Sequence, residues 1–379
     1  MKRMKRWVLA ATLACGCLPA LAQTDADMFT IATLNVDGLP QKVLVVNVNE
    51  DGPGNAGTAR IGKYLLRKGY DLVMMQEDFN YHEVLTVLLE DDYRFDTWSG
   101  DVGVEGRDID FLHLQNHRFG CDGLMACWKN DLAVTPMART AWKQSFGKFS
   151  HSNDELVTKG FRRYDVTLRN GTRLTVYNMH MDASDGADEA DGRDTKDKEA
   201  RMAQWAQLKD DVIAQLGTHP IVIVGDMNSF YGRDAVKQEF VDAINASGRG
   251  MVSDVWVEMQ RQGNYPTDRA QGENAGETLD KILYVNPVEG TQIQPVAFSL
   301  DRDGYRHDDK PLGDHYPVAA TFRVMPGKTG IESISSENPH AERPTNWYTI
   351  DGRTIDGKPA KGGIYIERHD GKADKFIIH

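Results

Sequence analysis

Residues 221–228 read IVIVGDMN, in which four consecutive β-branched residues lead into a short polar turn. A run that is apolar at every position, rather than at alternate positions, is typical of a strand buried on both faces of a layered α/β fold. Asp226 and Asn228 follow the strand at once. Polar side chains at such strand ends gather at one rim of the fold, so this stretch predicts a buried sheet with a functional site beside it.

Further apolar runs of strand length occur on both sides of this stretch, and Gly, Asp, Asn or Pro bounds most of them. They cover residues 29–34, 72–75, 132–134, 163–168, 174–179, 282–285 and 318–324. Apolar residues at helical spacing predict helices over 58–67 and 198–216. The alternation of strands and helices predicts one α/β catalytic domain over residues 27–325.

Polar residues stand at the ends of several of these runs. Taken alone, each would be read as a cap or turn residue, or as an ordinary buried histidine. Their recurrence predicts that they share one site. The set consists of Asn35, Glu77, His180, Asp226, Asn228, Asp280, Asp314 and His315.

The residue types in this set suit phosphoryl transfer assisted by a divalent cation. Glu77 offers a carboxylate and Asn35 an amide oxygen, which are ligands that hard cations prefer. Mg²⁺ is the expected ion, with Mn²⁺, Co²⁺ and Ca²⁺ as alternatives. A histidine held by a carboxylate is fixed in one tautomer and becomes a better base. Either Asp280 or Asp314 could hold His315 in this way.

Six short segments resemble, in order, the sequence blocks of the endonuclease/exonuclease/phosphatase superfamily. They are TLNV at 33–36, QE at 76–77, YNMH at 177–180, GDMN at 225–228, LDKI at 279–282 and DHYP at 314–317. The resemblance implies a four-layer α/β/β/α sandwich of two facing mixed sheets. One departure is Gly313, where the family often has Ser before the final Asp-His.

The resemblance also implies roles for the residues. Glu77 would bind the metal with Asn35 beside it, and Asp226 with Asn228 would orient the nucleophile and stabilise the pentacoordinate phosphorus. His315 resembles the general base for water, and His180 the group that stabilises charge or assists the leaving group. The family is not uniform on which histidine is acid and which is base, so that assignment stays open.

Two features resemble the neutral sphingomyelinase branch of this family. Lys159 lies in the segment KGF at 159–161, where the branch places a lysine on the substrate phosphate, and Arg201 with Gln204 also matches the branch. A solvated lysine at a strand edge is the alternative for Lys159. Trp256 and Tyr265 are candidates for an aromatic membrane contact.

The formal net charge of −12 agrees better with a zwitterionic sphingolipid at a membrane surface than with nucleic acid. The expected activity is therefore sphingomyelin hydrolysis to ceramide and phosphocholine. An extracellular nuclease, a phosphomonoesterase and an inactive binding module of the same fold are the alternatives. A monomer is expected.

Both ends of the chain read as targeting segments. Residues 1–22 combine basic residues, an apolar run and a small-residue cleavage site, which predicts a signal peptide and a secreted or cell-surface protein. Cys15 and Cys17 leave a lipid-anchored form as an alternative, and a periplasmic location is another. No other stretch is apolar enough for a transmembrane helix. Residues 326–345 read as a linker, and 346–379 resemble the sorting tails of secreted Bacteroidetes proteins, with an accessory β module as the alternative.

Cys121 and Cys127 are the only cysteines outside the expected signal peptide. In an oxidising compartment they could pair across a short loop. The sequence favours this disulfide over two buried thiols.

Overall fold

The computed structural model describes residues 27–43, 46–47, 49–102, 121–147, 151–155, 157–184, 195–328, 346–349, 353–355, 359, 361–369 and 372–378. The expected signal peptide and most of the expected linker lie outside these residues. The chain divides into two units, Met1–Gly327 and Lys328–His379, and each is described by itself.

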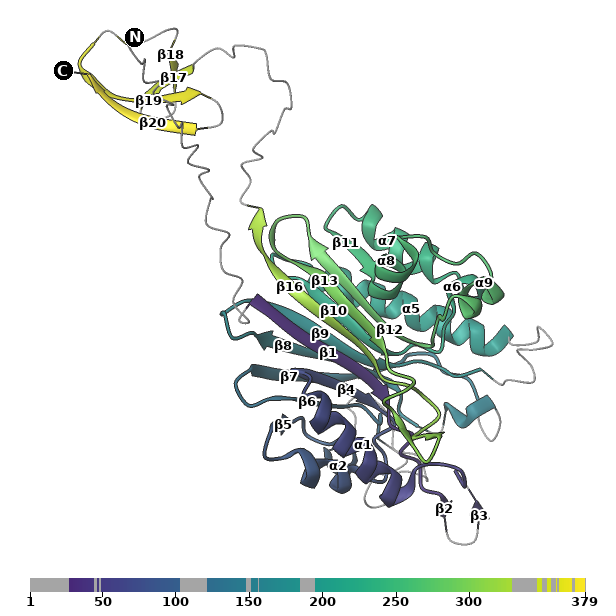
Figure 1. Cartoon of the computed structure of the whole chain (residues 1–379). Helices are drawn as coiled ribbons and strands as arrows, with labels where there is room; N and C mark the ends of the chain where they lie inside the picture. Colours follow the sequence, from purple (N-terminus) through teal and green to yellow (C-terminus); the bar gives the residue numbers. More distant parts are fainter. Residues whose placement is uncertain are drawn as a thin grey trace, which may run out of the picture. The chain divides into compact units, whose positions relative to one another are not determined.

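Six strands form the first sheet of the larger unit, in the order β13-β16-β1-β4-β6-β5. β1 runs parallel to β4 and antiparallel to β16, so the sheet is mixed. The β1–β16 pairing aligns Met28 with Arg323, which makes the first and last strands of the unit neighbours (Figure 1). The bounds are β1 Met28–Asn35, β4 Leu72–Gln76, β5 Tyr93–Phe95, β6 Met125–Lys129, β13 Gly290–Leu300 and β16 Val318–Lys328.

The second sheet also has six strands and follows the order β11-β12-β10-β9-β8-β7. β10 is parallel to β9 and antiparallel to β12. Its bounds are β7 Ala133–Ala141, β8 Gly160–Thr167, β9 Arg173–His180, β10 Ile221–Asp226, β11 Gly250–Asp254 and β12 Asp280–Pro287. Two small hairpins are formed by β2 Lys42–Val43 with β3 Val46–Asn47, and by β14 Arg306–His307 with β15 Lys310–Pro311.

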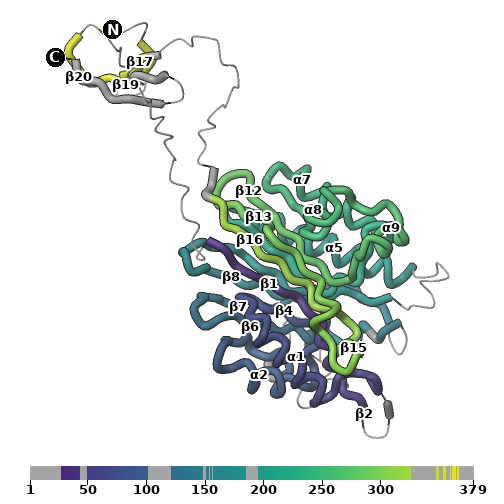
Figure 2. The backbone as a smooth tube through the Cα atoms, in the orientation of Figure 1, coloured from purple at the N-terminus to yellow at the C-terminus, as the bar shows by residue number. Residues whose placement is uncertain are grey.

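Helices cover the outer face of each sheet. On the first sheet these are α1 (Gly54–Lys68) and α2 (His82–Leu89), and on the second α5 (Thr195–Gln215) is the longest. Shorter helical segments are α3 Ser99–Val102, η2 His151–Asn153, α6 Tyr231–Asp234, η3 Lys237–Asp242, α7 Ala243–Ala246, α8 Val255–Arg261 and α9 Arg269–Asn274. Figure 2 traces the same path as a tube.

Three apolar cores hold these layers together. The period of two along each strand separates them, because successive side chains point to opposite faces. On β9, for example, Val176 lies in the core between the two sheets, whereas Tyr177 lies in the core beneath α5. A third core joins the first sheet to α1 and α2. The expected four-layer α/β/β/α sandwich of two mixed sheets is confirmed.

The apolar runs locate most strands of both sheets, but they do not predict β5, β6, β11 or β13, and the run at 132–134 covers only the start of β7. β6 consists of Met, Ala, Cys, Trp and Lys, a composition with little β-branched character. β13 carries Pro295 among polar residues, which a strand tolerates at the edge of a sheet, and β13 is an edge strand.

The predicted disulfide is wrong. No disulfide joins Cys121 and Cys127, and both side chains are buried. Cys127 lies on β6 opposite Val73 and belongs to the core beneath the helices of the first sheet. Burial raises the pKa of both thiols, so they are poor nucleophiles and serve the packing.

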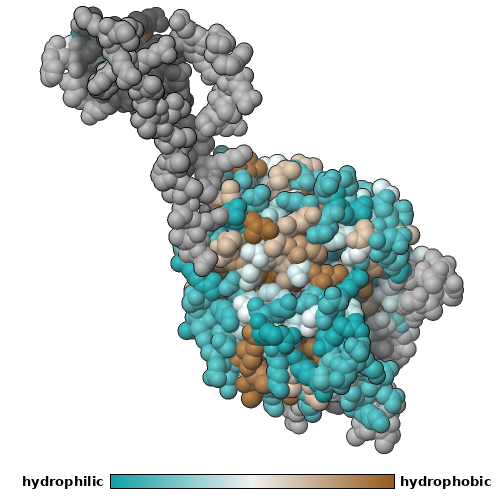
Figure 3. Space-filling model, in the orientation of Figure 1, coloured by the Kyte–Doolittle hydropathy of each residue, from teal (hydrophilic) through white to brown (hydrophobic). Residues whose placement is uncertain are grey.

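The aromatic candidates for membrane contact are also wrong. Trp256 is buried, and Tyr265 packs half-buried against the same core under the second sheet. Hydrophilic residues cover most of the coloured surface of the face drawn in Figure 3. Among the described residues, the large apolar side chains that are exposed are Val87, Met251, Val288 and Met325. No helix in the described part of the chain is both long and apolar enough to cross a bilayer.

The smaller unit contains a four-stranded antiparallel sheet in the order β18-β17-β19-β20. Its strands are β17 Asn346–Thr349, β18 Thr354–Ile355, β19 Gly363–His369 and β20 Lys372–Ile378. Trp347 on the central strand β17 is buried. This sheet agrees with the β-rich character expected for the tail.

Gly225 controls how closely β10 approaches β9 just before Asp226. Its φ is +150°, and a Cβ at this position would lie 2.1 Å from the carbonyl oxygen of Met179. We therefore expect Gly225→Ala to lower the free energy of unfolding by roughly 3 kcal/mol, through backbone strain and the clash.

Gly171 provides the matched control, because its φ is also positive (+81°) but open space surrounds its Cβ position. Gly171→Ala should cost only about 1 kcal/mol. Urea unfolding curves compare the two variants. Equal losses would mean that the approach of β10 to β9 is not tight.

Candidate active site

Three ionisable side chains stand in one row across the second sheet. Asp226 ends β10, and the strand register places it between His180 on β9 and Asp280 on β12. Val224, two residues before Asp226, belongs to the core between the sheets. Since residues two apart share a face, the row points toward the first sheet.

The first sheet supplies two more groups from neighbouring strand ends. Asn35 ends β1, and Glu77 follows the last residue of β4. Asn35 Nδ2 donates to Glu77 Oε1 at 2.9 Å and to Asp226 Oδ2 at 3.2 Å. Asn35 Oδ1 accepts the backbone N–H of Asp37 at 2.9 Å. One amide thus joins carboxylates that belong to different sheets.

The backbone is strained where it enters the site. Asp37, Glu77 and Asn228 all have positive φ, at 51°, 57° and 45°. Such conformations are costly for residues other than glycine and cluster at functional sites. Each of the three turns the chain sharply after a strand, and all three side chains line the same cavity.

This cavity has a volume of about 350 Å³ and opens between the strand ends of the two sheets. Asn35 and Asp280 lie behind its wall, where they are bonded to Glu77 and His315. The other predicted site residues line it directly: Glu77, Lys159, His180, Asp226, Asn228, Asp314 and His315. The structure therefore brings the whole predicted set together.

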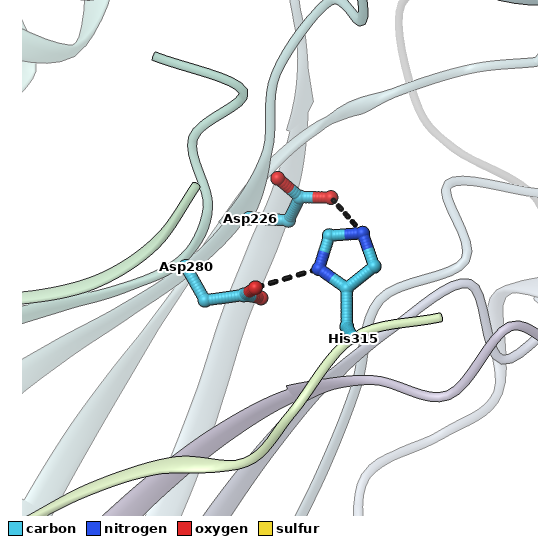
Figure 4. Close-up of side chains that lie close together, drawn as sticks. All are labelled: Asp226, Asp280 and His315. Carbon is cyan, nitrogen blue, oxygen red and sulfur yellow. Dashed lines mark hydrogen bonds and ion pairs between the residues drawn. The ribbon is translucent and has the colours of Figure 1, made fainter. Parts of the chain in front are cut away.

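His315 is held between two carboxylates (Figure 4). Its Nδ1 lies 2.6 Å from Asp280 Oδ2, and its Nε2 lies 3.7 Å from Asp226 Oδ2. Burial alone would lower the pKa of the imidazole, but the charges of Asp280 and Asp226 outweigh it and raise the pKa well above its ordinary value. Of the two carboxylates that the sequence leaves open, Asp280 is the one in contact with His315.

His180 lies on the other side of Asp226 and has the opposite electrostatic character. Its Nε2 is 3.4 Å from Asp226 Oδ2 and 3.9 Å from Glu77 Oε1. Burial, together with the nearby ammonium of Lys159, lowers the pKa of His180 well below its ordinary value. The pKa values of the two imidazoles are thus shifted in opposite directions, although both rings lie beside Asp226.

Asn228 is fixed by three hydrogen bonds. Its backbone N–H donates to Asp226 Oδ1 at 3.1 Å, and its Nδ2 donates to the carbonyl of Met181 at 3.0 Å. The guanidinium of Arg233 also donates to the carbonyl of Asn228. These bonds hold the strained turn and leave Asn228 at the cavity wall.

Lys159 is buried rather than solvated. Its ammonium forms an ion pair with Asp154 and donates to the carbonyl of Met181 at 3.3 Å. Burial would lower the pKa of Lys159, but Asp154 and Glu77 outweigh it and raise the pKa, so the ammonium stays charged. A buried positive charge at the wall of the cavity suits an anionic group of a ligand.

The predicted set leaves out Asp37, Asn49 and Asp154. Asp37 lines the cavity, and burial together with Asp314 raises its pKa to about 7. Asn49 Nδ2 donates to Asp37 Oδ1 at 2.5 Å. Asp37 stands two residues after Asn35, so the strand-end pattern could have found it. Asn49 and Asp154 lie in connecting segments, where no such pattern exists.

Two groups of side chains could hold a cation. Asp226, Asp280 and His315 offer atoms within 4.8 Å of one another. In the structure, however, His315 Nδ1 and Asp280 Oδ2 face one another at 2.6 Å, so these two atoms bond each other in this arrangement.

Glu77 and Asn35 form the second group and fit a hard divalent cation better. Burial raises the pKa of Glu77 more than Lys159 and the hydrogen bond from Asn35 lower it, and a cation would add to this compensation. In the structure Asn35 turns its Nδ2 toward Glu77, so rotation of the amide would be needed for Oδ1 to become a ligand.

Comparisons with known proteins agree with this geometry. The family model of the Endonuclease/Exonuclease/phosphatase family matches residues 32–315. The chain is 23% identical over 310 residues to a sphingomyelinase of Mycobacterium tuberculosis, and the match covers 80% of this chain and 54% of that protein. The chain therefore spans about half the length of the curated relatives it matches.

Solved structures resemble the fold. The human Nocturnin catalytic domain has a TM-score of 0.51 at 13% identity, covering 79% of this chain and 95% of that one. Sphingomyelinase C from Streptomyces griseocarneus has a TM-score of 0.49 at 20% identity, covering 78% of this chain and 99% of that one. At these identities the likeness concerns the fold alone.

The contact between Asp280 and His315 predicts how His315 titrates in the metal-free protein. A negative carboxylate stabilises the protonated imidazole, so the pKa of His315 should lie above 6.5. Asp280→Asn removes that charge and should move the pKa downward. Because the folded-state pKa is raised, the stabilisation from this pair is present at acidic to neutral pH and is lost as the pH rises through it.

NMR of the imidazole resonances measures both pKa values. His180 in the same spectra provides an internal control, since it should stay neutral across the neutral range. A His315 resonance that titrates at the same pH in the wild type and in Asp280→Asn would contradict the assignment of this pair.

Proposed function

Because this chain belongs to the endonuclease/exonuclease/phosphatase family, we propose that it is a metal-dependent phosphodiesterase that cleaves its substrate with an activated water molecule. Membership of the family makes the chain a phosphoesterase. The observation that carries the finer proposal is the position of Asp226 between the imidazoles of His180 and His315, at the wall of a cavity that also contains Glu77.

We assign His315 as the base that takes the proton of the attacking water. Its Nε2 lies 3.7 Å from Asp226 Oδ2, so one water molecule can bond both atoms at once. Asp280 holds Nδ1 and stabilises the imidazolium that forms. Since the charges of Asp280 and Asp226 raise the pKa of His315 and a base must be unprotonated, activity should increase as the pH rises through that pKa.

His180 then acts as a neutral donor to the oxygen that gains charge. Its low pKa keeps the ring uncharged, so it stabilises that oxygen through a hydrogen bond from a neutral N–H rather than by transferring a proton. Asn228 and Asp226 fix the direction from which water approaches. A divalent cation at Glu77 and Asn35, with Mg²⁺ as the first choice, would neutralise charge on the nonbridging phosphate oxygens.

For the substrate, we propose a sphingomyelin-like phosphodiester. The support is the similarity to the mycobacterial sphingomyelinase and the buried ammonium of Lys159 at the cavity wall. A net charge of −12 also disfavours a polyanionic substrate. The hairpin of β14 and β15, just before Asp314, carries exposed charged residues. Membrane contact through an aromatic tip is therefore not part of the proposal.

A paired assay tests this function. Purified protein with Mg²⁺ is offered sphingomyelin vesicles and supercoiled plasmid DNA in parallel. We expect release of phosphocholine and no nicking. Nicking without phosphocholine would transfer the proposal to a nuclease, and hydrolysis of a phosphomonoester alone would indicate a phosphatase.

Two matched variants show whether the turnover belongs to this site. His315→Ala should reduce kcat/KM by a few hundred-fold or more, as expected when a group that acts in the transition state is lost. His307→Ala removes an exposed imidazole on the nearby strand β14 and should leave the rate unchanged. Equal rates for the two variants would contradict the assigned role of His315.

We further propose that residues 1–22 direct export and that the C-terminal tail serves sorting rather than catalysis. The division of the chain into two compact units, Met1–Gly327 and Lys328–His379, supports this proposal. Truncation after Gly327 should leave kcat intact and change the amount of protein in the culture medium. A truncated enzyme without turnover would contradict the proposal.

A further inference from the structure

Three uncharged polar side chains lie fully buried between the two sheets, directly beneath the ionisable groups. They are Thr33 on β1, Gln76 on β4 and Asn178 on β9, each with an exposed fraction of 0%. Buried polar groups are costly unless their hydrogen bonds are made, so a layer of this kind calls for a functional reason.

Asn178 belongs to the second sheet, but its side-chain amide donates its hydrogen bonds to backbone carbonyls of the first sheet. Its Nδ2 donates to the carbonyls of Met75 on β4 and Met125 on β6, both at 3.0 Å. Its Oδ1 accepts from Nε2 of Gln76 at 2.7 Å. All three hydrogen bonds cross the space between the sheets.

Gln76 completes the layer on the side of the first sheet. Besides Asn178, its Nε2 lies 3.1 Å from Thr33 Oγ1 and 3.3 Å from the carbonyl of Met74. Its Oε1 lies 3.2 Å from Thr33 Oγ1. The amide of Gln76 is therefore held within its own sheet while it bonds the other one.

The place of this layer in the chain links it to the site. Gln76 immediately precedes Glu77, and Asn178 precedes His180 by two residues on the same face of β9. One step deeper, Met74 and Val176 belong to the apolar core. Along the strands toward the site, the side chains between the sheets are thus first apolar, then amides and then ionisable groups.

Apolar packing fixes how much surface two sheets bury but is non-directional, whereas hydrogen bonds specify one arrangement. The site needs such an arrangement, because Glu77 and Asn35 come from one sheet and His180 and Asp226 from the other. We propose that Asn178 and Gln76 are positioning residues that set the sheet-to-sheet geometry of the active site. As regards turnover, this inference rests on the proposed phosphodiesterase function.

The test uses variants of similar shape that lack the crossing bonds. Asn178→Leu and Gln76→Met should each lower kcat by tenfold or more, since displacements of about 1 Å can cost on the order of a hundredfold. KM should change much less. Because the two residues act as one unit, the double variant should lose little more than either single variant.

Val176→Ala is the matched control. Val176 lies on the same strand and face, one step deeper, and its loss leaves a cavity in the same core without removing a hydrogen bond. It should lower Tm and leave kcat unchanged. Thr33→Val, which removes only the hydroxyl at the edge of the layer, provides a milder variant with a smaller loss of kcat if Asn178→Leu fails to fold.

A second measurement separates this inference from the proposed function. The imidazole resonances of His180 and His315 should shift in Asn178→Leu and stay in place in Val176→Ala, whether or not the protein cleaves any substrate offered. If the wild type showed no turnover, the phosphodiesterase proposal would be contradicted, but the comparison of resonances would still test the positioning role. Unchanged resonances in Asn178→Leu, or equal changes in both variants, would overturn the positioning role.

Discussion

The carboxylate of Asp226 is the point on which the site depends, because groups from both sheets converge on it. Its Oδ2 lies 3.2 Å from Asn35 Nδ2, 3.4 Å from His180 Nε2 and 3.7 Å from His315 Nε2. Burial would raise the pKa of Asp226, but the surrounding positive groups, His315 first among them, lower it. A carboxylate that stays charged in a buried place can organise both imidazoles around it.

This arrangement depends on the distances between strands that are far apart in the sequence. Asn35 and Asp226 are bonded to one another although 191 positions separate them. Only the facing of the two sheets brings them together. The hydrogen bond between Gln76 and Asn178 can fix the position of one sheet relative to the other, whereas apolar packing alone would tolerate small shifts between them.

The sequence patterns predicted the fold and most of the site residues, because side chains at the ends of neighbouring strands lie close together. His180 and Asp226 each end a strand that reads clearly as apolar, and parallel neighbours deliver such residues to one rim. The sequence could not decide whether Asp280 or Asp314 contacts His315, because both lie next to a strand. Only the positions of the side chains in the structure distinguish them. The sequence also could not predict that Asp154 pairs with Lys159, because no periodic pattern constrains a connecting segment.

The pairing of Met28 with Arg323 has a consequence for how the larger unit comes into being. Among the described strands of the larger unit, β1 is synthesised first and its neighbour β16 last, so the first sheet stays incomplete until nearly the entire unit has been synthesised. Long-range pairing of this kind slows folding, because the entropy of closing a long loop must be overcome before the contacts form. The same adjacency means that a short peptide could join the two ends and new termini could be opened in a surface loop, giving a circularly permuted enzyme with every strand pairing retained.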